Sequence, residues 1–62
     1  MSAGPELSSV ATALADLKDR VGALAEDLGS ETREDLAATL YEVERSLGAA
    51  ARRLETMVDE LR

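Results

Sequence analysis

The sequence predicts an all-α protein: an antiparallel, coiled-coil-like αα-hairpin that dimerises into a four-helix bundle. Three observations support this fold class. The composition is rich in Ala and Leu, with Glu, Asp and Arg around them, which is typical of helices and coiled coils. Large apolar residues recur on average every 3.5 residues in two separate runs. A polar stretch with helix stop and start signals separates the two runs.

A first helix is predicted over residues 5–28, after a flexible N-terminus at residues 1–4. Pro5 suits the first position of a helix, because the N–H that proline lacks would have no intrahelical acceptor there. The apolar spacing alternates three and four without interruption and indicates one continuous seam. The seam consists of Leu7, Val10, Leu14, Leu17, Val21, Leu24 and Leu28.

A turn is predicted at residues 29–31. Gly29 suits the left-handed position just past a helix end. Ser30 or Thr32 can cap the next helix by accepting a bond from a free N–H. Three acidic side chains lie in or near the first turn of the second predicted helix, where the helix dipole stabilises negative charge. If the chain were a single long helix, two of them would occupy seam positions and interrupt its apolar stripe. The three acidic residues are Glu31, Glu34 and Asp35.

A second helix is predicted over residues 31–61, which makes residues 5–62 one hairpin domain. Its seam consists of Leu36, Leu40, Val43, Leu47, Ala50, Leu54, Met57 and Leu61. When the chain is folded at the turn, seam residues whose numbers sum to 64 pair throughout, for example Leu17 with Leu47. This complementarity favours a hairpin. One long helix that dimerises end to end stays open as the alternative.

The two flanks of the predicted hairpin differ. With Leu7, Leu14, Leu40 and Leu47 at heptad position a, the g rows are polar, whereas the e rows and adjoining b positions carry mainly small residues. Two mid-helix glycines there cost about 1 kcal/mol each, a cost that close approach of another helix offsets. We therefore predict a protein interface on this flank, with Lys18 and Glu44 facing each other and Tyr41 at the rim. Its residues are Ala11, Ala15, Lys18, Gly22, Ala25, Ala37, Tyr41, Glu44, Gly48, Ala51 and Val58.

Composition favours a binding function. The chain has no His, Cys or Trp, so no catalytic residue, metal ligand or cofactor site is predicted, and we expect a non-enzyme. A net charge of −6 disfavours general nucleic-acid binding. With no long apolar run and no visible signal peptide, we expect no membrane contact and a cytoplasmic location. The Arg- and Ala-rich composition suggests a bacterial source.

The predicted function is that of a small interaction or assembly module. The expected partner is a second copy of the same chain, because a domain of this size is marginal alone and has no Cys for a disulfide. The alternative is a regulatory or accessory subunit whose hairpin docks onto a helix of a different protein, such as a transcription factor or an enzyme. A small ligand between the helices is left open.

Overall fold

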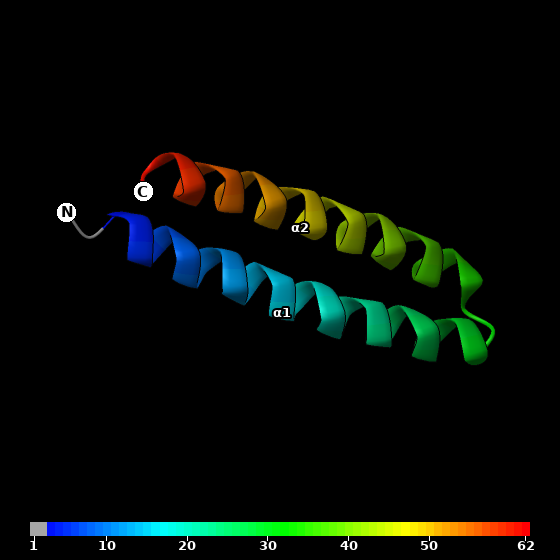
Figure 1. Cartoon of the computed structure of the whole chain (residues 1–62). Helices are drawn as coiled ribbons and strands as arrows, with labels where there is room; N and C mark the ends of the chain where they lie inside the picture. The colour runs from blue at the N-terminus through cyan, green and yellow to red at the C-terminus, as the bar shows by residue number, and fades with distance from the viewer. Residues whose placement is uncertain (1–2) are drawn as a thin grey trace.

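Two antiparallel helices make up the protein. A computed structural model describes residues 3–62, in which α1 spans Ala3–Ser30 and α2 spans Glu34–Glu60. The helices lie side by side along their length, and the chain turns back at residues 31–33 (Figure 1). The predicted all-helical hairpin is therefore confirmed, and the single long helix is not formed. Neither helix is both long enough and apolar enough to cross a membrane.

Helix α1 begins two residues earlier than predicted. Ala3 and Gly4 are helical, whereas the sequence predicts a flexible N-terminus there; Met1 and Ser2 lie outside the described residues. Pro5 is thus the third residue of the helix instead of the first. This position remains compatible with proline, because the first four N–H groups of a helix have no intrahelical acceptor.

The end of α1 differs from the prediction at Gly29. This residue stays helical and has no positive φ; the left-handed residue is Thr32, with φ 63°. The Arg33 N–H donates to the Leu28 carbonyl at 2.9 Å, and the Thr32 N–H donates to the Gly29 carbonyl at 3.3 Å. These two bonds are those of a Schellman motif, displaced by three residues from the predicted glycine. Gly29 instead faces α2, where an added Cβ would lie 3.8 Å from the Ala37 Cβ.

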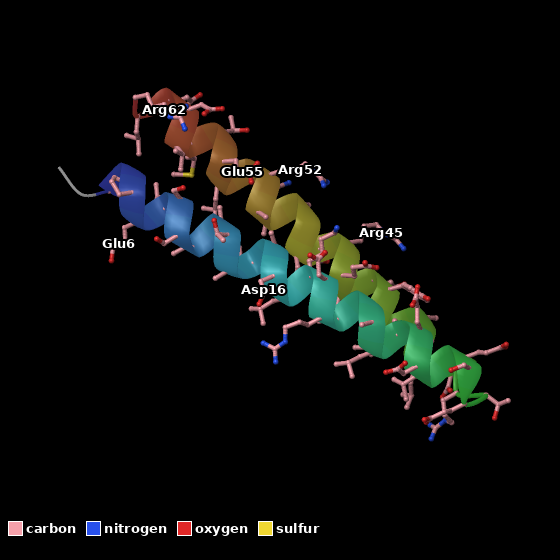
Figure 2. The ribbon with its side chains drawn as sticks, turned by 60° about the horizontal axis from the view of Figure 1, so that its bottom comes forward. Glu6, Asp16, Arg45, Arg52, Glu55 and Arg62 are labelled. Atoms are coloured by element: carbon pink, nitrogen blue, oxygen red, sulfur yellow. The ribbon has the colours of Figure 1, made fainter. Side chains whose placement is uncertain are left out.

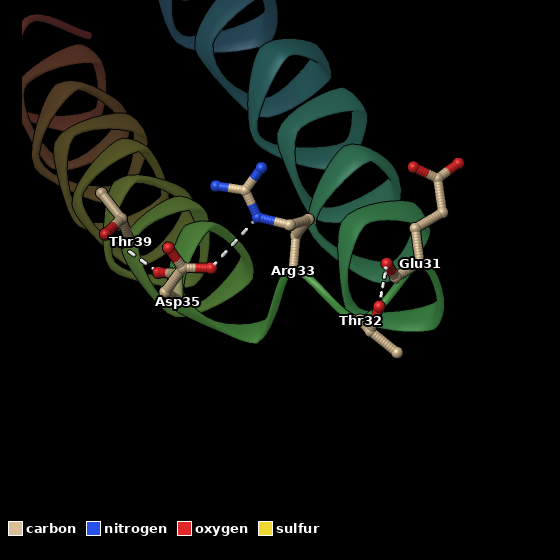
Figure 3. A network of polar contacts seen from close by, with 5 residues as sticks. All are labelled: Glu31, Thr32, Arg33, Asp35 and Thr39. Carbon is tan, nitrogen blue, oxygen red and sulfur yellow. Dashed lines mark hydrogen bonds and ion pairs between the residues drawn. The ribbon is translucent and has the colours of Figure 1, made fainter.

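The predicted hydroxyl caps of the second helix are wrong. The Ser30 Oγ donates to the Asp27 carbonyl of its own helix at 3.0 Å. The Thr32 Oγ1 donates to the carbonyl of Glu31 (Figure 3). Both hydroxyls therefore serve the end of α1, because the displaced turn places them before the start of α2 instead of at it.

Helix α2 begins at Glu34, three residues later than predicted. Arg33 occupies the N-cap position without a side-chain cap bond, and its Nε donates to Asp35 Oδ1 at 3.5 Å (Figure 3). Glu34 and Asp35 lie in the first turn as predicted, where the helix dipole stabilises their negative charges. Glu31 lies in the connecting turn.

Thr32 provides a test of the turn. A β-branched residue in the left-handed region costs about 1–2 kcal/mol, and glycine removes this cost while adding unfolded-state entropy. We expect Thr32→Gly to raise the free energy of unfolding by about 0.5–1 kcal/mol, measured by urea denaturation at fixed chain concentration. Thr32→Ala is the matched control and should gain less, because it retains a Cβ. Equal effects of the two substitutions would contradict the left-handed turn.

Candidate protein-interaction face

Small residues form the contact between α1 and α2. The buried residues of the described chain are Ala11, Ala25, Ala37, Gly48, Ala51 and Val58. Ala25 is 0% exposed, and no large side chain among residues 3–62 is fully buried. Five of the six buried residues occupy the predicted e rows. The helices therefore meet through the flank that was predicted to dock a second chain.

The register also differs from the predicted pairing. An added Cβ on Gly22 would lie 2.6 Å from Glu44 Oε2, and one on Gly48 would lie 3.3 Å from Lys18 Cδ. These pairs, like Gly29 and Ala37, have residue numbers that sum to 66 instead of 64. Each pair joins an e position on one helix to a b position on the other. Both helices are rotated about their own axes from the predicted a/d contact toward e and b.

The two central glycines accommodate long charged side chains. The aliphatic part of Lys18 covers Gly48, and the carboxylate of Glu44 covers Gly22, so each helix places one long side chain on the glycine of the other. Lys18 was predicted to oppose Glu44. Instead its Nζ lies 3.9 Å from Asp19 Oδ1 on the same helix. The glycines therefore make room within the hairpin for side chains that alanine would crowd.

The other predicted interface residues are less deeply buried. Ala15, Lys18, Gly22 and Glu44 are half-buried, and Tyr41 is exposed. The expectation of a free small-residue flank thus differs from the structure. The physical reason is that small side chains let two helix backbones approach closely, and the second helix of the same chain already occupies that position.

Rotation of the helices leaves the large apolar residues on one side of the hairpin. The exposed d-row residues are Val10, Leu17, Leu24, Leu36, Val43 and Met57. Beside them lie the remaining seam residues, of which Leu61 is exposed and the others are half-buried: Leu7, Leu14, Val21, Leu28, Leu40, Leu47, Ala50 and Leu54. We call these two sets together the leucine face. Leu24, the most exposed of them, is 55% exposed.

Helix geometry places both halves of the leucine face on the same side. At 3.6 residues per turn, positions a and d lie to one side of the e row, and positions b and f lie to the other. In an antiparallel pair that meets through the e rows, the a and d positions of both helices then share one side. A groove on the opposite side confirms this arrangement, because it is lined by b, e and f positions of both helices. Its residues are Ser8, Ala11, Thr12, Glu55, Val58, Asp59 and Arg62.

Charged side chains lie away from the leucine face. Arg45 and Arg52 occupy f positions, on the side of the hairpin opposite the leucine face, and their side chains extend outward from α2 (Figure 2). No seam position carries a charge; the adjoining g rows, which form the two edges of the face, mix charged and small polar residues. Among residues 3–62, no three carboxylates gather as metal ligands. The arrangement is therefore suited to apolar contact with another helical surface.

No protein-family model matches the chain. No curated protein and no solved structure is significantly similar to it.

Ala25 tests the position of the small-residue contact. Leucine at this fully buried position would force the helices apart, so we expect Ala25→Leu to lower the free energy of unfolding by about 1–3 kcal/mol. Ala23→Leu is the matched control, because Ala23 is exposed and the same change there should stay within about 0.5 kcal/mol. Both are measured by urea denaturation. Equal effects at the two positions would show that Ala25 faces solvent.

Gly22 tests the accommodation of Glu44. An added Cβ would meet only the mobile end of the Glu44 side chain, which swings aside, while alanine favours the helix. We expect Gly22→Ala to raise the free energy of unfolding by about 0.5–1 kcal/mol in thermal or urea unfolding. Gly48→Ala should gain less, because its Cβ would press on the stem of Lys18. A loss of stability at Gly22 would show that the Glu44 carboxylate is held in place.

Proposed function

We propose that this protein is a non-enzymatic helical interaction and assembly module that self-associates through the leucine face. Two hairpins that stack face to face would form a four-helix bundle with twofold symmetry. The observation that carries the proposal is the distribution of burial within one chain. Within residues 3–62 the hairpin buries only alanines, one glycine and Val58, while leucine, valine and methionine side chains on one face are exposed or half-buried.

The hydrophobic effect supports a second layer on this face. Burial of apolar surface contributes about 25 cal/mol per Å², and a lone hairpin leaves its largest apolar side chains in water. With 28 residues in α1 at about 1.5 Å each, the face is roughly 40 Å long. Two helix widths of about 10 Å each make its area on the order of 800 Å². Stable protein interfaces bury about 800 Å² per partner, so the face is large enough.

The packing of α1 on α2 supports a four-helix arrangement in particular. In a bundle, each helix directs its a and d positions to the common centre and touches a neighbour with an e or g flank. Here α1 and α2 touch through e and b, which leaves both a/d stripes on one side. The hairpin thus has the geometry of half a bundle. In the dimer, the polar g rows would form the two edges between the copies.

Residue chemistry supports a non-enzymatic role. Without His or Cys, proton transfer or nucleophilic attack would rest on carboxylates, Lys18 or Tyr41. Tyr41 is 41% exposed and the Lys18 side chain is also 41% exposed, so neither is enclosed away from water. Catalytic groups work in enclosed, preorganised surroundings, which an isolated two-helix layer does not provide.

The alternative function is that of an accessory subunit whose leucine face receives a helix of a different protein. One observation favours it: no charged residue within the face specifies a partner. The two functions differ in what the chain does alone. A self-associating module is folded and dimeric by itself, whereas an accessory hairpin stays weakly helical and monomeric until its partner is present.

The deciding experiment is light scattering across a wide concentration range, with circular dichroism on the same samples. We expect a strongly helical species with twice the 6.6 kDa chain mass, and helicity that falls together with mass on dilution. A weakly helical monomer at every concentration would overturn self-association and favour the accessory function.

Leu24 tests the face directly. Leu24→Glu should shift the protein toward monomer, because dimerisation would bury an unpaired charge at a cost of several kcal/mol. We expect the dissociation constant to rise at least about 100-fold, measured by sedimentation. Ala23→Glu is the matched control: it adds the same charge one residue away, at an exposed position outside the leucine face, and should leave the mass unchanged. Equal masses for the two variants would exclude the leucine face as the interface.

A further inference from the structure

The two ends of the hairpin differ in charge. At the turn, residues 26–35 contain five carboxylates and one guanidinium, a side-chain charge of −4 out of the −6 of the chain. At the open end, residues 3–8 and 57–62 contain three carboxylates and one guanidinium, a side-chain charge of −2. The acidic character of the protein is therefore concentrated at the turn.

The apolar stripes are centred at the same level of the hairpin. On α1 the stripe extends from Leu7 to Leu28, and its central residue is Leu17. On α2 it extends from Leu36 to Leu61, and its centre lies between Leu47 and Ala50. The contact of Lys18 with Gly48 places both centres side by side across the hairpin. A twofold axis at this level, perpendicular to the helices, maps each stripe onto itself in reverse.

From these two observations we propose that two copies of the chain stack with their turns at opposite ends, so that Leu17 lies beside Leu17 of the other copy. This inference rests on the proposed self-association and adds its geometry. On α1 the axis sets Leu14 beside Val21 of the other copy, and on α2 it sets the large Leu47 beside the small Ala50. Every seam residue of one copy then meets a seam residue of the other.

Electrostatics separates this arrangement from its competitor. A twofold axis along the helices would also cover the leucine face, but it would place the two turns together. Two clusters of charge −4 would then lie within about 20 Å, two helix widths, with many charge pairs closer. At physiological salt the Debye length is about 8 Å, so the nearest of these pairs repel without full screening. With the turns at opposite ends, each −4 cluster instead lies beside an open end of charge −2.

Spin-label distances test the orientation. The chain has no Cys, so one introduced cysteine carries one label per copy. Thr32→Cys labels the exposed turn, and Asp16→Cys labels an exposed position near the level of the axis. We expect a distance of roughly 40 Å or more between turn labels, from the helix length at about 1.5 Å per residue. Labels at position 16 should lie within about 30 Å in either orientation, which makes them the control for dimerisation.

The outcomes distinguish this inference from the proposed function. A long distance at position 32 with a short one at position 16 supports the opposite-end dimer. Short distances at both positions overturn the orientation and leave self-association standing. The absence of any intermolecular distance at position 16, together with a monomer mass, overturns self-association and this geometry with it.

Discussion

The close contact of small residues between α1 and α2 determines the rest of the structure. Alanine and glycine at the e and b positions let the two backbones approach, as at the fully buried Ala25. Leucine in the same rows would force the helices apart. The large apolar residues are consequently displaced to one side, where they form a continuous face instead of a closed seam. The choice of which residues touch inside the chain therefore also decides which surface is left for another molecule.

The middle of the contact shows how the helices keep this spacing while carrying charged residues. Lys18 and Glu44 are too long to lie between two alanine-lined backbones, and each has a glycine opposite it on the other helix. The two glycines lower the helix propensity of both segments, a cost of about 1 kcal/mol each. No second chain is needed to fill the space beside the glycines, because the Lys18 stem and the Glu44 carboxylate occupy it.

Periodicity was sufficient to predict both helices and their antiparallel pairing, because the apolar repeat and its interruption are local properties of the sequence. It was not sufficient to predict the rotation of each helix. A stripe of a, d and e positions, such as Leu14, Leu17 and Ala11, is too wide to fit between two helices, and only packing decides which part is enclosed. The signal was present in the contrast of residue size: rows of alanine and glycine favour the closest approach. The turn was misplaced for a similar reason, since Gly29 packs against Ala37 and leaves Thr32 to adopt the left-handed conformation.

Within the proposed dimer, folding and assembly form one equilibrium. A single hairpin that buries alanines and one valine has little apolar area to offset the conformational entropy of ordering some sixty residues, a cost of about 1–2 kcal/mol per residue for the backbone alone. The leucine face supplies the missing area only when it is covered, so the bound form is also the folded form. The acidic turn then has a second consequence. Because charge is concentrated at one end, repulsion between the turns affects the relative orientation of the two copies more than their total affinity. The uncharged face therefore does not need to specify the orientation, because the charged ends select the direction of stacking.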